Sequence, residues 1–183
     1  MDDLTLTKLM AATALNDETA FRKLVEACQS RVYATAFRIL CNEDDAKDIV
    51  QDTFLRIWLN RDTFQDDRKF TSWMYSIATN LCLDKLKSQK RRNWNKASEE
   101  ELRNLIASDN IEQHLADTEL EQIIRNLTHR LSPKQKVVFT LNDLENMALD
   151  DIVQITGQSP TKIKSNLYLA RLAMRKMLNK LLK

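Results

Sequence analysis

The chain has 183 residues, of which 43% are hydrophobic and 30% charged, enough of both to form a buried core and a hydrophilic surface. With one glycine and two prolines it has few turn residues for hairpins, which favours an all-α fold. No apolar run approaches the roughly 20 residues that span a bilayer, and the N-terminus lacks the apolar core of a signal peptide, so we expect a cytoplasmic protein without membrane insertion.

The net charge of only +2 conceals a segregated distribution. Basic residues gather at 85–96 and at 162–183, whereas acids dominate 99–121. This pattern indicates separate surfaces for anionic partners, although basic runs at helix ends also occur as solvated faces.

The cysteines and histidines predict neither a metal site nor another cofactor. Cys28, Cys41 and Cys82 are widely spaced and odd in number, so no disulfide framework or paired metal motif is visible. His114 and His129 have no nearby ligand set.

The first half of the chain predicts three amphipathic segments. Residues 20–40 form a helix or a bent pair of helices, and Asn42, followed by three acids, caps the next one. That helix has an apolar face and an opposite face with Asp48, Gln51, Asp52 and Leu55. After a polar loop at 60–69, residues 70–90 resume as a helix that Thr71 or Ser72 could cap.

The second half predicts a tether and a second helical domain. Apolar residues are sparse and acids abundant from 93 to 117, which indicates a flexible linker with a short helix at 99–107. An amphipathic helix follows at 120–131, and Ser132 with Pro133 starts another that runs to Leu144. We therefore predict two small helical domains, 1–93 and 118–183, joined by an acidic linker at 94–117.

The only glycine, Gly157, lies between two helix-patterned segments, 149–156 and 160–178. Glycine adopts left-handed backbone angles without steric cost and commonly ends helices, whereas proline at 160 suits a first helical turn. The second segment carries only basic charges. This predicts a helix-turn-helix whose second helix approaches phosphates.

Three stretches together resemble the extracytoplasmic-function (ECF) sigma factors, a group of bacterial RNA polymerase specificity subunits. They are residues 45–58 (DAKDIVQDTFLRIW), 70–84 (FTSWMYSIATNLCLD) and 131–139 (LSPKQKVVF), the last leading into the helix-turn-helix. The resemblance covers about Ala20 to Leu178. It implies sigma region 2 in the first domain and sigma region 4 in the second.

The first stretch matches the helix that docks on the polymerase β′ coiled coil. The resemblance assigns this role to Asp48, Gln51, Asp52 and Leu55. Acids around an exposed leucine suit a basic, partly apolar partner helix, whereas a solvated face is the simpler alternative.

The second stretch matches the part of region 2 that recognises the minus-ten promoter element and helps to open the duplex. Single-strand recognition needs stacking surfaces, hydrogen-bonding side chains and cations. Because Trp73 continues the apolar stripe, we expect Phe70 and Tyr75 to be the better stacking residues, with the loop at 62–69 forming a base pocket. The expected minus-ten contacts are Phe70, Tyr75, Ser76, Thr79, Asn80 and Lys87.

The third stretch leads into the helix that enters the major groove at the minus-thirty-five element. Because the first turns of such a helix read the bases, Thr161, Lys164 and Ser165 are the expected specificity residues. Leu169 stands where relatives often have a cation, which predicts fewer phosphate contacts. The expected contacts are Ser159, Thr161, Lys162, Lys164, Ser165, Tyr168 and Arg171.

The resemblance implies a transcription initiation factor, not an enzyme. Its partners would be core RNA polymerase, through the β′ and β subunits, promoter DNA and an anti-sigma factor. Nucleotide-binding, zinc-protease and nucleophile motifs are missing from the sequence. The alternatives are a helix-turn-helix transcriptional regulator with a helical effector domain and a helical adaptor with solvated basic faces.

Overall fold

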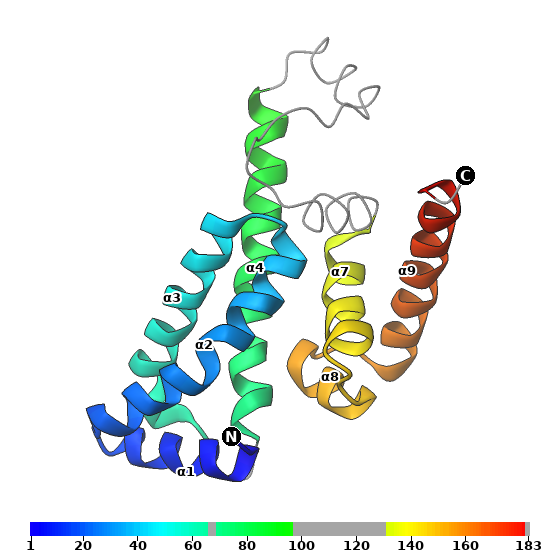
Figure 1. The fold of residues 1–183 in the computed structure, drawn as a ribbon. Helices are drawn as coiled ribbons and strands as arrows, with labels where there is room; N and C mark the ends of the chain where they lie inside the picture. Colours follow the sequence, from blue (N-terminus) through cyan, green and yellow to red (C-terminus); the bar gives the residue numbers. More distant parts are fainter. Residues whose placement is uncertain (66–68, 97–130, 182–183) are drawn as a thin grey trace.

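The computed structural model describes residues 1–65, 69–96 and 131–181, and within these ranges the chain is helical without strands (Figure 1). The first domain contains α1 (Asp3–Ala14), α2 (Glu18–Leu40), α3 (Glu43–Leu59), the 3₁₀ turn η1 (Arg61–Thr63) and α4 (Phe70–Lys96). The second contains α7 (Pro133–Phe139), the π-helical turn η2 (Thr140–Leu144), α8 (Leu149–Thr156) and α9 (Pro160–Leu181). None of these described helices is long and apolar enough to cross a membrane.

Two sequence predictions need boundary corrections. The helix expected at 70–90 extends to Lys96 and so passes the expected domain boundary at residue 93. The loop expected from residue 60 begins with the short turn η1. The rest of the expected linker, the helix expected at 99–107 and, except for Leu131, the helix expected at 120–131 lie outside the described residues.

The first domain is built around the α2–α3 pair. Asn42 caps α3 as expected, since its Oδ1 accepts the Asp45 N–H at 2.8 Å. The apolar face predicted for α3 is confirmed: Ala46, Ile49 and Ile57 are buried against the neighbouring helices. The opposite face is exposed, which leaves it available for a partner.

The first turn of α4 is stabilised by a residue of α1 and not by Thr71 or Ser72. Thr71 and Ser72 lie inside the first turn, because the helix begins at Phe70. The Thr71 N–H donates to Oδ1 of Asp3 at 3.2 Å, so a residue of α1 accepts from one of the unpaired amides of this first turn. The expectation that Thr71 or Ser72 caps the helix is therefore wrong.

The second domain confirms the predicted helix-turn-helix. Ser132 and Gln135 form a capping box at the start of α7. The Ser132 Oγ accepts the Gln135 N–H at 3.4 Å, and the Gln135 Oε1 accepts the Ser132 N–H at 2.9 Å. Gly157 ends α8 with φ of 63°. A Cβ built there would meet nothing within 4 Å, so the glycine serves the backbone angle and not a close approach. Ile163 and Ala170 anchor the inner face of α9, whereas Leu178 near its end is exposed.

The two domains pack directly against each other. Helices α7 and α8 lie against α4, and one continuous cluster of buried apolar residues extends across both domains (Figure 1). Polar contacts border this apolar junction. Glu145 pairs with Arg38 of α2 and accepts the Thr35 hydroxyl at 3.2 Å, and Lys69 pairs with Asp151 of α8 at 2.8 Å.

Candidate nucleic-acid and protein interfaces

The residues expected to bind polymerase share one exposed face of α3. Asp48, Gln51, Asp52 and Leu55 follow one another at steps of three, one and three residues, and Leu55 is 54% exposed. Large apolar side chains are costly to hydrate, so an exposed leucine one turn after an acid is a suitable contact for a helix with mixed basic and apolar character.

Lys85 of α4 forms ion pairs with two acids of α3 beside this face. Nζ of Lys85 lies 2.7 Å from Asp45 and 3.2 Å from Asp48, and these carboxylates, Asp45 above all, raise the pKa of Lys85. Lys85 therefore offsets part of the charge of Asp48. Asp52 and Leu55 lie further along the same exposed face.

The residues expected at the minus-ten element divide into buried and accessible groups. Phe70 and Thr79 are at most 1% exposed and Tyr75 is 4% exposed, whereas Asn80 and Lys87 are exposed and Ser76 is half-buried. Ser76, Asn80 and Lys87 are spaced by four and seven residues, which places them on one face of α4.

The structure corrects the expectation for the aromatic residues. Phe70 packs edge-on against Phe64 and Trp73, with ring centroids 6.1 and 6.3 Å away. Trp73, expected in the core, is half-buried, as is Phe64. In this arrangement Phe70 cannot stack on a base, because its neighbours cover it completely.

Tyr75 and Thr79 are inaccessible to DNA for different reasons. Burial, followed by the nearby charge of Glu145, raises the pKa of Tyr75, so the phenol lies close to the junction with the second domain. The Thr79 hydroxyl donates to the Tyr75 carbonyl at 2.7 Å and thus serves its own helix. Tyr75 is therefore inaccessible to DNA while the domains are packed together.

The residues expected at the minus-thirty-five element all lie on the exposed surface at and after the start of α9. The Ser159 Oγ accepts the Lys162 N–H at 3.4 Å, and Tyr168 is 67% exposed. Thr161, Lys164 and Tyr168 are spaced by three and four residues and so share one face. The first turns of α9 thus present hydroxyls and cations, the side-chain types that can contact base edges and phosphates. The exposed set is Ser159, Thr161, Lys162, Lys164, Ser165, Tyr168 and Arg171.

Arg171 is held by its own domain. Its Nη2 lies 2.6 Å from Asp143 and 2.9 Å from the Asn142 side-chain oxygen, and the Asp143 carboxylate raises its pKa. The guanidinium is therefore oriented but partly neutralised. The role of Asp143 could not be predicted from the sequence, because the pair joins residues in separate elements.

The described part of the chain contains no cluster of three or more potential metal-ligating side chains. Cys28, Cys41 and Cys82 are reduced and buried, and burial raises the pKa of Cys82 to about 12. Burial of the Cys82 thiol and its raised pKa are typical of a packing residue and not of a nucleophile. The structure thus defines a helical protein with a helix-turn-helix domain and, on α3 of the other domain, a separate exposed face that carries acids and Leu55.

Comparison with known proteins identifies the class. Residues 24–92 match the family model "Sigma-70 region 2", and residues 121–174 match "Sigma-70, region 4". The chain is 28% identical to the ECF RNA polymerase sigma factor SigW of Bacillus subtilis over 98% of this chain and 100% of SigW. It is 30% identical to RNA polymerase sigma factor SigV of the same organism, over 81% of this chain and 84% of SigV.

A solved structure agrees at the level of the fold. The sigma factor RpoE of Bartonella quintana, crystallised in complex with the anti-sigma factor NepR, superimposes with a TM-score of 0.67 at 20% identity, over 87% of this chain and 96% of RpoE. The chain belongs to the ECF sigma factors of the sigma-70 family. It is a transcription initiation factor with sigma regions 2 and 4.

Proposed function

We propose that this chain docks on the β′ subunit of core RNA polymerase through Asp48, Gln51, Asp52 and Leu55, and reads the minus-thirty-five element with the first turns of α9. The observation that carries the proposal is the two-sided character of α9: its inner face is anchored by Ile163 and its outer face is hydroxylic and basic. Recognition at both sites needs binding energy but no chemical catalysis.

For the minus-ten element we propose that Ser76, Asn80 and Lys87 contact the DNA strand. Asn80 both donates and accepts hydrogen bonds, as base-edge recognition requires, and Lys87 carries a cation for the backbone. Tyr75 would join them only after region 4 moves away from α4. We therefore include separation of the two domains as a step that precedes promoter binding.

The residue boundaries 1–93, 94–117 and 118–183 for region 2, linker and region 4 belong to the same proposal. So does an anti-sigma factor as a regulatory partner, which the complex of the Bartonella relative supports. The site of action would be the cytoplasm, where bacterial polymerase transcribes.

Run-off transcription with core polymerase tests the assignment. Lys164→Ala should weaken initiation roughly tenfold on a template with an intact minus-thirty-five sequence, since one base contact is worth about 1–3 kcal/mol, but barely on a template with that element scrambled. Equal losses on both templates would point to a phosphate contact. Asp52→Lys should weaken core binding; an unchanged core affinity would remove the α3 assignment.

A further inference from the structure

A furrow with an apolar floor lies on the surface between α2 and α3. A cavity of about 610 Å³ at one end has polar residues of α2 at its border and the apolar side chains of Phe21, Val25, Phe54, Leu55 and Trp58. A second cavity of about 510 Å³ adjoins the first, because Gln29 lines both.

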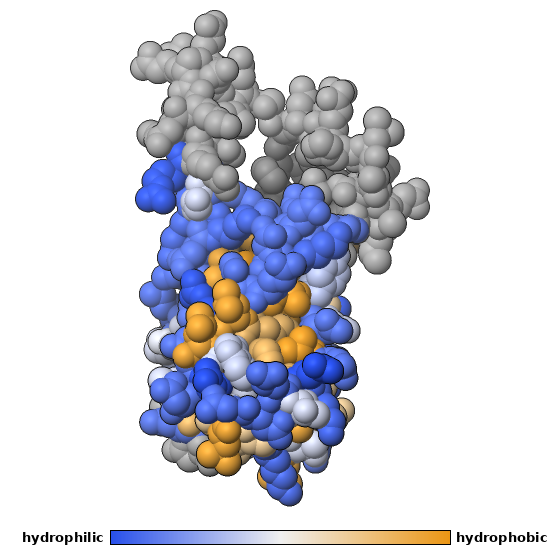
Figure 2. Space-filling view, turned by 90° about the vertical axis from the view of Figure 1, so that its left-hand side faces the viewer, coloured by the Kyte–Doolittle hydropathy of each residue, from blue (hydrophilic) through white to orange (hydrophobic). Residues whose placement is uncertain are grey.

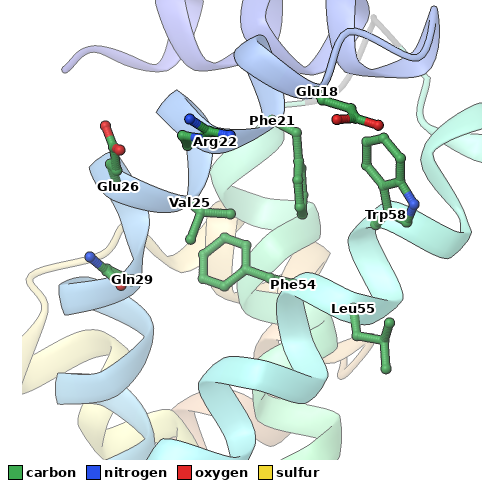
Figure 3. Close-up of a pocket in the computed structure, with 9 residues that line it drawn as sticks. All are labelled: Glu18, Phe21, Arg22, Val25, Glu26, Gln29, Phe54, Leu55 and Trp58. Carbon is green, nitrogen blue, oxygen red and sulfur yellow. The ribbon is translucent and has the colours of Figure 1, made fainter.

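The apolar floor is preformed. Figure 3 shows Phe21 of α2 beside Trp58 of α3, and Phe54 pointing towards Val25 across the gap between the helices. The Phe21 and Trp58 ring centroids are 4.9 Å apart. Figure 2, which views the molecule from this side, shows apolar side chains gathered in the middle of the face with hydrophilic surface around them. A contiguous exposed apolar patch of this kind marks an interaction site.

The α2 border of the furrow carries charges of alternating sign. Glu18, Arg22 and Glu26 line the first cavity at steps of four residues, so they form one row along the helix. Opposite charges at this spacing often pair within a helix. In the part of the chain that the structure describes, however, none of these three side chains forms an ion pair or a hydrogen bond. The charges of the row are therefore available to a partner outside the chain.

A row of this kind is complementary to itself. In a two-fold symmetric pair of molecules, every contact between two different residues occurs twice, once in each direction. If two α2 helices cross antiparallel about an axis between Arg22 and Glu26, Arg22 of each copy faces Glu26 of the other. The two reciprocal ion pairs then lie beside the apolar floors of both copies. A border of a single sign would instead repel a second copy.

We propose that the furrow binds a second copy of this chain, and that Arg22 and Glu26 form reciprocal ion pairs across the two-fold axis of the dimer. Nine residues line the first cavity and six the second, with Gln29 common to both, whereas a stable interface takes roughly 20–30 residues on each side. The dimer is therefore weak and forms only at high protein concentration.

The dimer covers part of the face assigned to polymerase. Leu55 lines the first cavity and Gln51 the second, so a second copy in the furrow covers both residues. Dimer formation and docking on polymerase then exclude each other, and copies in excess of the polymerase are held in a form that cannot initiate transcription. This consequence rests on the proposed function, whereas the dimer itself does not.

Exchanging the charges tests the dimer by sedimentation velocity of the full chain over a range of concentrations. The parent should show a concentration-dependent equilibrium between monomer and dimer. Arg22→Glu and Glu26→Arg should each weaken self-association by about tenfold, because each change turns two attractions into two repulsions. An equimolar mixture of the two variants should recover the affinity of the parent, since both reciprocal pairs again join opposite charges. Arg175→Glu makes the same change of charge on α9, in the other domain, and should associate like the parent.

The outcomes are decisive for the second copy. A parent that stays monomeric at every concentration would overturn the proposal. A mixture that associates no better than either variant alone would also overturn it, because the reciprocal pairing would be wrong. Core polymerase is the other occupant: if Arg22→Glu alters core affinity while the parent does not self-associate, the furrow belongs to the polymerase interface and our proposal fails. Sedimentation of the chain alone involves no polymerase, so the test holds even if the proposed function fails, and circular dichroism checks that the variants fold.

Discussion

Removing the Glu145 carboxylate should loosen the contact between the two domains. Glu145 pairs with Arg38 and accepts the Thr35 hydroxyl at 3.2 Å, and its side chain is only 17% exposed. Glu145→Ala removes both contacts and leaves the Arg38 guanidinium, itself 33% exposed, without this carboxylate. Glu145→Ala therefore weakens the contact between the two domains.

The partial burial of Glu145 and Arg38 sets the expected shift in the equilibrium between packed and separated domains. Hydrogen bonds to charged groups contribute about 1.5–3 kcal/mol, and solvent around Arg38 reduces the net effect to about 1–2 kcal/mol. That range corresponds to a change of roughly 5- to 30-fold in the equilibrium between packed and separated domains.

Cys41 provides the assay. This residue is 7% exposed at the end of α2 and lies near Lys136 of α7, whose pKa is lowered by burial. If alkylation requires the domains to separate, the labelling rate of Cys41 should rise by the same factor in Glu145→Ala. Cys28 and Cys82 are fully buried and should stay unreactive, so they detect global unfolding.

An unchanged Cys41 rate in a normally folded Glu145→Ala variant would refute the role given to this contact. Equal acceleration at all three cysteines would instead mean that the variant unfolds as a whole. Asp151→Asn is the matched comparison. It breaks the more exposed pair with Lys69, and we expect a smaller acceleration.

Two further predictions concern stability. Gly157→Ala should cost about 1–2 kcal/mol, because alanine pays for left-handed angles although space is available. Thermal unfolding measures this, Gly157→Asn should recover part of the loss, and an unaltered melting temperature would contradict the backbone argument. The second prediction concerns Lys85, whose pKa is raised by Asp45. Because the folded-state pKa lies above the unfolded value, its stabilisation is complete below the unfolded pKa and is lost as the pH rises through the folded pKa. Unfolding curves between about pH 9 and 12 should therefore show a decline that Asp45→Asn reduces; equal slopes would argue against it.

Much of the fold could be predicted from signals between neighbouring residues. Asn42, Ser132 and Gly157 were predicted as cap and turn residues, and each acts within a few residues of its own position. The apolar period of α3 likewise predicted which of its faces is buried. Such features follow from neighbouring residues, so a sequence can specify them.

Contacts between residues far apart in the sequence could not be predicted from such local signals. The hydrogen bond of Glu145 with Thr35 joins residues 110 positions apart, and burial followed by the charge of Glu145 raises the pKa of Tyr75 in α4. Periodicity tells which side of a helix is apolar but not how completely another element covers it. For the same reason Phe70 was expected to be accessible, although it is buried.

The bond between Asp3 and the Thr71 amide bears on the design of shorter fragments. The stretch that resembles the family begins near Ala20, yet Leu6 and Met10 of α1 are buried in the core of region 2. A fragment cut at Ala20 would expose the apolar surface beneath α1 and leave the Thr71 amide at the start of α4 without its Asp3 acceptor. Isolated region 2 prepared for DNA-binding or structural work should therefore keep α1 together with its N-cap residue, Asp2.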